Sequence, residues 1–291
     1  MASIADYAMQ LSQLDPYIGN LPMEKVHLGS LQPYITDRRQ QGIKTKSINL
    51  ALSVVRRILN LASRLWRDEN GLTWLDTPPL IQMLPVTDAR PPYPLSWEEQ
   101  RTLFRALPDH LARMALFTVN TGCREQEVCQ LRWDWEVKAP ELDTSLFIVP
   151  GERVKNREDR LVVLNRVAMS VVEQARGIHP EHVFSYKGHA VGTINNSGWK
   201  TARKKAGLSQ VRVHDLKHTF GRRQRAANVP LETRKVLLGH RNGDITTHYS
   251  APELEELLAA VNKVCEEKSG TGYAETKNGW RVICQPFDNF E

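Results

Sequence analysis

A proline-rich stretch, PVTDARPPYP at residues 85–94, constrains this chain more than any other feature. Four of its ten residues are proline, which fixes φ and lacks a backbone donor, so neither a helix nor a central strand can continue through it. We expect an extended linker over residues 85–95. It divides the 291 residues into a smaller N-terminal domain, residues 1–84, and a larger part that begins at residue 96.

Helical periodicity dominates the N-terminal domain. The clearest helix is expected over Ser47–Arg67, because apolar side chains recur there every three or four residues. These apolar residues are Ile48, Leu52, Val55, Leu59, Ala62 and Trp66. The opposite face carries Arg56, Arg57, Arg64 and Arg67. A basic face of this kind suits either solvent or a polyanion.

The pattern after the linker predicts helices with a small sheet between them. Ser96 and Glu99 form a capping-box pair, which predicts a helix beginning near Trp97. A second helix is expected over Leu111–Thr121, ending at Gly122. The pattern then indicates short strands at Trp133–Val137, Leu146–Pro150 and Arg160–Leu164. Helices return at residues 165–176 and 193–206, so we expect a mainly α chain with a small antiparallel β-sheet.

Charge is distributed unevenly along the chain. The first 250 residues hold 35 Lys and Arg against 25 Asp and Glu, whereas residues 251–291 hold four against eight. The densest basic segment is residues 200–225, with nine bases and one acid. Such a segment favours a polyanionic partner, bound with an affinity that falls as the salt concentration rises.

The composition gives no sign of a metal site, a disulfide framework or a membrane segment. The four cysteines, at positions 123, 129, 265 and 284, have no Cys-x-x-Cys spacing. No segment approaches the roughly 18 apolar residues that cross a bilayer, and the first thirty residues lack a basic leader followed by an apolar run. We expect a cytoplasmic protein without a metal or other cofactor.

The stretch with the most candidate catalytic side chains begins with His214 and Lys217. Their spacing places the imidazole and the ammonium one helical turn apart, while Leu216 and Phe220 can face a core. We expect this polar pair to point outward from a packed helix.

Three further residues of this stretch belong to the same pattern. Gly239 stands where a helix would stop, His240 follows it, and Tyr249 comes nine residues later in Ile-Thr-Thr-His-Tyr-Ser. Each of these residues alone is more often structural than chemical. Their order and spacing within 36 residues carry the information.

This order resembles the C-terminal signature of the tyrosine recombinases, the phage integrase family. That family also carries an earlier Thr-Gly-x-Arg-x-x-Glu segment, which is present here as Thr121 to Glu127 with Arg124 as its arginine. A family lysine between two strands is matched by Lys155, in the polar tip before residues 160–164. The chain departs from the pattern at Lys217, where the family has a second arginine.

The resemblance implies a site-specific recombinase of the integrase type that cleaves and rejoins DNA strands through a covalent 3′-phosphotyrosine at Tyr249. Arg124 and Lys217 would hold the two non-bridging phosphate oxygens, with His240 donating beside them. His214 would assist the tyrosine and Lys155 would protonate the leaving 5′ oxygen. Glu127 would support Arg124, and no metal would be needed. Lysine keeps the charge of arginine at position 217 but loses its planar fork.

The resemblance also implies partners and a division of labour. Residues 1–84 would form a clamp domain on double-stranded DNA, residues 96–250 the catalytic domain, and residues 251–291 a tail. The tail's amphipathic helix, Pro252–Cys265, would dock either on a neighbouring subunit of a DNA-bound tetramer or on its own domain. The resemblance also suggests accessory DNA-bending proteins as partners and an association with the bacterial nucleoid. The candidate DNA contacts are Arg38, Arg39, Lys44, Lys46, Arg56, Arg57, Lys200, Arg203, Lys204, Arg222 and Arg241.

Three other interpretations remain open from the sequence. A type IB topoisomerase would use the same residues on one strand as a monomer. A catalytically weak or inactive DNA-binding protein would need only the basic patches. A metal-dependent enzyme built on His214 and His218 is disfavoured, because no acid completes a His-Glu-x-x-His pattern.

Overall fold

The computed structural model describes residues 4–239, 251–265, 270–276 and 279–285. The chain divides into two compact units, Met1–Pro91 and Pro92–Glu291, which are described separately below.

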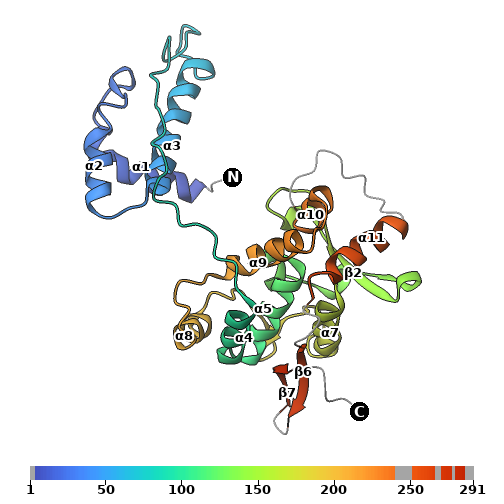
Figure 1. Cartoon of the computed structure of the whole chain (residues 1–291). Helices are drawn as coiled ribbons and strands as arrows, with labels where there is room; N and C mark the ends of the chain where they lie inside the picture. The colour runs from blue at the N-terminus through green and yellow to red at the C-terminus, as the bar shows by residue number, and fades with distance from the viewer. Residues whose placement is uncertain (1–3, 240–250, 266–269, 277–278, 286–291) are drawn as a thin grey trace. The chain divides into compact units, whose positions relative to one another are not determined.

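The first unit is a small helical bundle (Figure 1). Its helices are α1 (Ile4–Ile18), α2 (Gln32–Gln40) and α3 (Thr45–Arg64). Side chains from all three helices form one core, in which Leu14, Tyr34, Ile48, Leu52 and Leu59 are buried. The predicted apolar stripe of α3 therefore faces this core from Ile48 to Ala62, as its helical period requires.

The bounds of α3 differ from the expected Ser47–Arg67. The helix begins two residues earlier because the carboxylate of Asp88 accepts a 2.8 Å hydrogen bond from the backbone N–H of Thr45, which caps the helix from a distant part of the chain. It ends at Arg64, so Trp66 lies beyond the helix. Trp66 still packs against the same core and contacts Trp74 at a ring distance of 5.2 Å.

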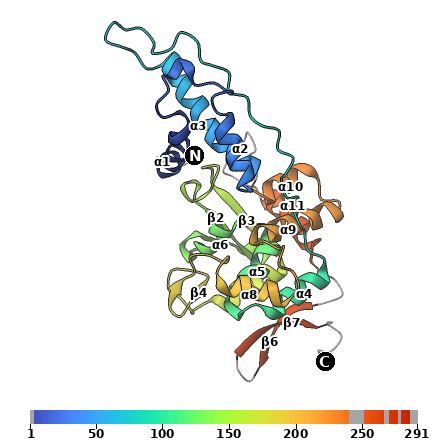
Figure 2. The same ribbon diagram turned by 90° about the vertical axis from the view of Figure 1, so that its left-hand side faces the viewer.

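The second unit surrounds one buried helix with the others (Figures 1 and 2). Its helices are α4 (Trp97–Ala106), α5 (Asp109–Thr121), α6 (Glu125–Cys129), α7 (Arg166–Ala175), α8 (Ser197–Lys205), α9 (Val213–Ala226), α10 (Leu231–Leu237) and α11 (Ala251–Asn262). In α5, every residue from Leu111 to Thr121 except Arg113 is buried. It packs against α7 and α9, so α5 is the central helix of this unit.

A three-stranded antiparallel sheet lies between α6 and α7 in the chain. Its strands are β1 (Glu136–Ala139), β2 (Thr144–Val149) and β3 (Arg160–Val163), in the order β1-β2-β3. Residues Trp133–Trp135 form a 3-10 turn, so the expected first strand at Trp133–Val137 is wrong in its first half. The register pairs Val149 with Arg160, which places Arg160 at the start of β3 beside the end of β2.

Two hairpins complete the second unit. Strand β4 (Ser185–Tyr186) pairs with β5 (His189–Ala190), and β6 (Gly270–Thr276) pairs with β7 (Gly279–Gln285), both antiparallel. With the sheet, they confirm a mainly α chain with small antiparallel sheets.

Side-chain caps explain where several helices begin. The capping box of Ser96 and Glu99 is present, and α4 begins at Trp97 as expected. The expected helix at residues 193–206 begins only at Ser197, because the side chain of Asn196 accepts a hydrogen bond from Trp199 N at 3.2 Å. Such caps fix a helix end more closely than periodicity does.

The helix α11 docks on its own unit. Leu257, Val261 and Val264 are buried against Phe220 of α9 and Val163 of β3. This apolar stripe is the one expected from the sequence, although the helix ends at Asn262 rather than Cys265. None of the described helices is both long and apolar enough to span a membrane.

Candidate active site

The end of α5 begins the site. Gly122 caps this helix with φ of +63°, a conformation that only glycine adopts without strain. A Cβ at this position would lie 2.4 Å from Cδ1 of Phe220 on α9. Gly122 is therefore required both by the backbone conformation and by the close approach of α9, and it turns the chain so that Arg124 begins the next helix.

Arg124 is the N-cap residue of α6. Its backbone N–H donates to Glu127 at 2.7 Å and its Nη1 donates to the other carboxylate oxygen of Glu127 at 2.6 Å. The Arg124 side chain remains 24% exposed. A partly exposed guanidinium held at a helix N-terminus can bind an anion from solvent.

Glu127 is buried between two guanidinium groups. It is 3% exposed and forms ion pairs with Arg124 and with Arg160 of β3. Burial raises the pKa of Glu127, but the charge of Arg160 and the hydrogen bonds from Arg124 outweigh burial, so the pKa is lowered overall. The carboxylate is therefore ionised when both arginines are in place.

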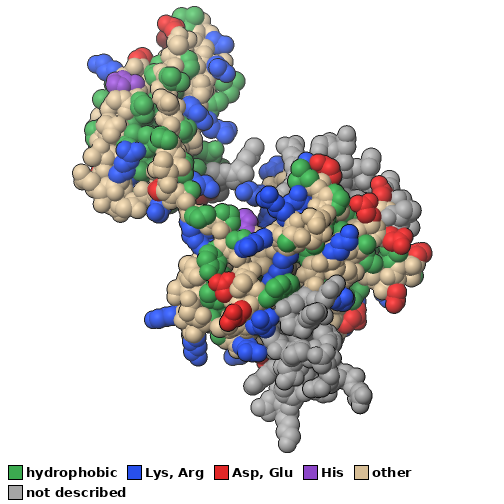
Figure 3. Space-filling model, in the orientation of Figure 1, with side chains coloured by type: hydrophobic (Ala, Val, Ile, Leu, Met, Phe, Trp, Pro, Cys, Tyr) green, Lys and Arg blue, Asp and Glu red, His purple; other side chains and the backbone are tan. Residues whose placement is uncertain are grey.

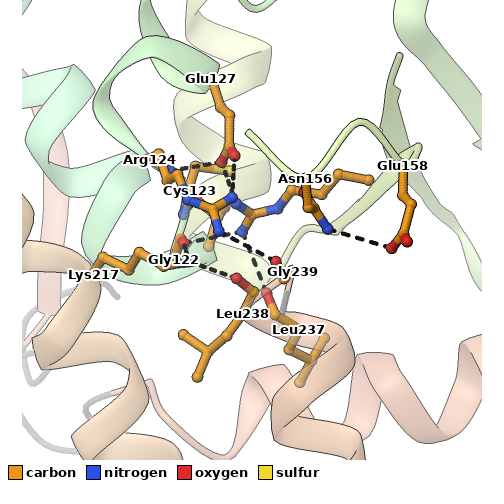
Figure 4. Close-up of polar contacts among 12 residues, drawn as sticks. Gly122, Cys123, Arg124, Glu127, Asn156, Glu158, Lys217, Leu237, Leu238 and Gly239 are labelled. Carbon is orange, nitrogen blue, oxygen red and sulfur yellow. Dashed lines mark hydrogen bonds and ion pairs between the residues drawn. The ribbon is translucent and has the colours of Figure 1, made fainter. Parts of the chain in front are cut away.

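Lys217 does not point outward, contrary to the expectation for the His214–Lys217 pair. It is 5% exposed, and its Nζ donates to the carbonyl oxygens of Gly122 at 2.6 Å and of Leu238 at 2.5 Å, as Figure 4 shows. The reason is that α9 packs so closely on α5 that this face of the helix is covered. Burial, followed by the charges of Arg160 and Arg124, lowers the pKa of Lys217 to about 7.

His214 lies in the first turn of α9 and is exposed. Its ring is 4.7 Å from that of His218, edge to face. Partial desolvation and the nearby positive charges of His218 and Lys217 lower the pKa of His214. The imidazole is therefore neutral at pH 7 and can accept a proton. In the described residues, no group of three His, Cys, Asp or Glu side chains is arranged to hold a metal ion.

Lys155 lies in the connection between β2 and β3, where the sequence placed it. The connection is fixed at its base by a 2.8 Å hydrogen bond from Gly151 N to the Asp159 carboxylate, and inside by the buried Val154. Lys155 follows Val154 and is exposed. Figure 4 shows Asn156, next along this connection, with its side-chain amide directed to the carboxylate of Glu158, to which it donates at 3.4 Å.

The end of α10 contacts Arg124, Arg160 and Lys217. Three successive carbonyl oxygens each accept a hydrogen bond from a different side chain: Leu237 from Arg160 at 3.4 Å, Leu238 from Lys217, and Gly239 from Arg124 at 3.4 Å. Helix C-termini carry partial negative charge, which favours cations there. We call Arg124, Arg160 and Lys217 the cation cluster. The expected helix stop at Gly239 is confirmed, with φ of +58°.

Two of the predicted catalytic residues, His240 and Tyr249, lie outside the described residues, as does Arg241. The structure thus brings together Arg124, Glu127 and Lys217. It places His214 in the first turn of the helix that carries Lys217.

Arg160 was missed as a site residue. The signal was present in the alternation of Arg160, Val162 and Leu164, because a period of two assigns all three to the same face of a strand. All three are buried. A charged residue on the inward face of an apolar strand predicts a buried partner, and here that partner is Glu127.

The candidate DNA contacts lie on both units, and most are exposed. Arg38 and Arg39 are in the last turn of α2, and Lys46, Arg56 and Arg57 lie on α3. The remaining described candidates are Lys44 before α3, Lys200, Arg203 and Lys204 on α8, and Arg222 on α9.

Charge also separates on the surface of the second unit. Figure 3 shows Lys and Arg side chains gathered over α9 and α10 and acidic side chains over α11. Arg203 is partly engaged within the chain, donating to Val211 O at 2.7 Å. In the first unit, Ser53, Arg56, Arg57, Asn60 and Arg64 line a shallow hollow on α3.

Comparison with known proteins identifies the family. The model of the phage integrase family matches residues 95–256, which is more than half of the chain. The chain therefore belongs to the phage integrase family.

Relatives and solved structures agree with this assignment. The chain is 25% identical over 235 residues to the integrase of Salmonella phage P22, a match that covers 75% of this chain and 57% of that protein. It is 23% identical over 241 residues to the tyrosine recombinase XerA of Thermococcus kodakarensis, covering 79% of each. The chain thus spans little more than half the length of the P22 integrase.

Two solved structures show the same fold. A lambda integrase dimer bound to a COC' core site superposes with a TM-score of 0.64 at 17% identity, covering 84% of this chain and 89% of that one. The XerH site-specific recombinase bound to a palindromic difH substrate gives 0.63 at 16% identity, covering 81% and 72%.

Proposed function

We propose that this chain is a site-specific DNA recombinase of the integrase type, which cleaves and rejoins strands through a covalent phosphotyrosine at Tyr249. The observation that carries the proposal is the bond from Arg124 to the carbonyl of Gly239, 115 residues away. This bond joins the Thr-Gly-x-Arg segment to the glycine of the Gly-His pair. Lys217, of the His-x-x-Lys pair, donates to the carbonyl oxygen of Gly122 in the first segment and to that of Leu238, next to the second. Motifs far apart in sequence therefore meet at one place.

The chemistry proceeds by exchange of one phosphorus–oxygen bond for another. The phenol oxygen of Tyr249 attacks the phosphorus, the bond to the 5′ oxygen breaks, and the strand leaves with a 5′ hydroxyl. A 5′ hydroxyl of a partner strand reverses these steps and releases the tyrosine. The energy of the phosphodiester is kept in the protein–DNA bond, so resealing needs no cofactor.

The charges around the site suit this reaction. The five-coordinate phosphorus gathers negative charge, which Arg124 and Lys217 neutralise and to which His240 donates. The partly exposed guanidinium of Arg124 is available to a phosphate from solvent. Lys155, exposed on its loop, donates the proton that the leaving 5′ oxygen takes up.

His214 is the proton acceptor for Tyr249 in this proposal. A phenol ionises near pH 10 in water, so it needs a base within reach at neutral pH. The lowered pKa of His214 keeps the imidazole neutral and able to accept that proton.

Residues 1–84 act as a clamp on double-stranded DNA, and exposed basic side chains of both units bind phosphates. Phosphate contacts set the register of the protein on DNA without selecting a sequence. A structure of lambda integrase residues 75-356 with the same fold, at a TM-score of 0.62, is bound to DNA, and this supports the same class of partner here. A location on the bacterial nucleoid follows from such binding.

Recombination requires several copies of the chain, and we propose a tetramer on DNA. A lambda integrase tetramer bound to a Holliday junction shares the fold, with a TM-score of 0.62 at 16% identity over 85% of this chain and 73% of that one. Exchange of the tail between subunits would require α11 to leave the apolar cluster that it forms with Phe220 and Val163. Accessory DNA-bending proteins would bring distant sites together.

The experiment is relaxation of supercoiled plasmid in EDTA by the wild type and by Tyr249→Phe. Relaxation by the wild type alone supports metal-free tyrosine chemistry, whereas equal relaxation by both proteins contradicts it. Strand exchange between two plasmids then separates a recombinase from a type IB topoisomerase, which would relax DNA without joining different molecules.

One observation favours a second candidate, a catalytically weak or inactive DNA-binding protein. The two short bonds of Lys217 to carbonyl oxygens occupy the ammonium inside the protein. Under this alternative, cleavage appears only in Lys217→Arg. Comparable cleavage by wild type and Lys217→Arg supports the recombinase.

A further inference from the structure

Arg160 is the most deeply buried cation of the cluster. It is 2% exposed and opens β3, with its guanidinium bonded to the Glu127 carboxylate and to the carbonyl oxygens of Gly122 at 3.0 Å and Leu237 at 3.4 Å. A buried guanidinium is costly unless its donors are matched by acceptors; here Nη1 and Nη2 have acceptors, whereas Nε has none among the described residues. These three acceptors belong to α6, to the end of α5 and to the end of α10.

Arg160 lies beside Lys217, because both donate to the same oxygen. The carbonyl of Gly122 accepts from Lys217 Nζ at 2.6 Å and from Arg160 Nη2 at 3.0 Å. The resemblance to the family places a guanidinium at position 217. Here the helix supplies an ammonium and the neighbouring strand supplies a guanidinium, which is the group with a planar fork.

One side of that fork acts on Arg124 through Glu127. Arg160 binds one oxygen of the carboxylate, and the Arg124 guanidinium binds the other. The carboxylate therefore cannot rotate without breaking one of two charged bonds. Arg124 is the partly exposed member of the cluster. The direction of its guanidinium is set, through Glu127, by Arg160, which solvent does not reach.

The other side of the fork acts on the end of α10. Arg160 bonds to Leu237 O, and a Cβ at Gly239 would lie 2.9 Å from Cδ and from Nε of Arg160. The arginine side chain thus packs directly under the turn that precedes His240. A change of side chain at position 160 would move this turn as well as Glu127.

We propose that Arg160 is a positioning residue for strand cleavage: it orients Arg124 through Glu127, fixes the end of α10, and supplies the buried guanidinium that position 217 lacks. The proposal rests on the proposed function. It places no contact between Arg160 and DNA, since the side chain is enclosed by protein.

The electrostatics give this proposal a readout that folding alone would not change. The charged and titratable groups around Glu127 are Arg124 from its own helix end, Arg160 from β3, Lys217 from α9 and Cys123. The charge of Arg160 is the largest influence that lowers the pKa of Glu127. Without it, the carboxylate takes up a proton at higher pH and releases Arg124.

The test compares the full-length wild type with Arg160→Gln, Arg160→Lys and a control, Arg176→Gln. Arg176 also forms ion pairs with two glutamates, Glu136 and Glu173, but on α7 and β1. The first measurement is the titration midpoint of the Glu127 carboxyl by NMR of carbon-labelled glutamate, assigned with Glu127→Gln. We expect the midpoint to rise in Arg160→Gln, to stay near that of the wild type in Arg160→Lys, and to be unchanged in the control.

The second measurement is the rate of plasmid relaxation in EDTA as a function of pH. We expect Arg160→Gln to lower the rate at its optimum by about 100-fold, the scale of a misplaced catalytic group, and to move the acidic limb to higher pH in step with the Glu127 midpoint. Arg160→Lys should recover part of the rate, because the charge remains and the fork is lost.

An unchanged Glu127 midpoint in Arg160→Gln would overturn the proposal. So would a rate that falls equally at every pH with its acidic limb in place, which is the behaviour of a residue that only stabilises the fold. A wild type that relaxes no plasmid would count against the proposed function alone, since the carboxylate titration requires no catalysis.

Discussion

Lys217 donates a 2.5 Å hydrogen bond to the carbonyl oxygen of Leu238, one residue before the turn at Gly239. This bond ties α9 to the end of α10, and the bond to Gly122 ties the same ammonium to the end of α5. A lysine enclosed in this way links the protonation of one side chain to the packing of three helices.

The stability of the chain should depend on pH through Lys217. The pKa of Lys217 is about 7 in the folded chain against an ordinary 10.5, so between these values the unfolded chain binds more protons. Stability therefore rises with pH across this window, by at most about 1.4 kcal/mol per pH unit from this group. Urea unfolding at pH 7 and pH 9 should show the rise in the wild type and its loss in Lys217→Met.

An exposed lysine outside the cation cluster gives the control. Lys263→Met, just beyond α11, should keep the wild-type slope. The same slope in Lys217→Met as in the wild type would show that Lys217 holds its proton equally in both states.

Gly122→Ala should be strongly destabilising. The new Cβ would meet Phe220 at 2.4 Å in a backbone with φ of +63°, so packing and conformation both oppose it. We expect a loss of about 3 kcal/mol in the free energy of unfolding. Gly177→Ala is the matched control, because φ is +76° there and nothing lies within 4 Å; it should cost only about 1 kcal/mol. Equal losses would mean that contact with Phe220 contributes nothing.

Glu127→Gln should affect both stability and activity. It leaves the buried guanidinium of Arg160 without its charged partner, and we expect a loss of about 3 kcal/mol together with slower plasmid relaxation. Glu173→Gln removes a half-exposed partner of Arg176 and should cost no more than about 0.5 kcal/mol. Chemical denaturation of the wild type, Glu127→Gln and Glu173→Gln measures both losses in the free energy of unfolding. Equal losses in the two variants would contradict a special contribution from the buried Glu127–Arg160 pair.

Arg56→Gln should lower the salt dependence of DNA binding. The residue is exposed in the hollow on α3, and removing one phosphate contact reduces the slope of log affinity against log salt by about 1. The measurement is fluorescence anisotropy with a duplex at several salt concentrations. Lys263→Gln, next to the acidic face of α11, should leave the slope unchanged. An unchanged slope in Arg56→Gln would show that Arg56 on α3 makes no phosphate contact.

Local rules were enough to predict much of the fold. The capping box of Ser96 and Glu99, the helix stops at Gly122 and Gly239 and the apolar stripe of α3 each depend on residues a few positions apart. The motifs likewise identified Arg124 and Lys217, which the structure brings to one place.

Contacts between distant residues account for what could not be predicted. Asp88 caps α3 across 43 residues of sequence, and the periodicity of α3 contains no sign of it. The burial of Lys217 depends on how closely α9 packs on α5, which helical spacing alone does not reveal. Arg160 could have been found from strand alternation, but its partner Glu127 lies 33 positions earlier.

The shared acceptor of Arg160 and Lys217 also has an evolutionary consequence. One carbonyl oxygen, that of Gly122, accepts from both side chains, so a substitution at either position changes the surroundings of the other. Among homologous chains, positions 160 and 217 should therefore covary.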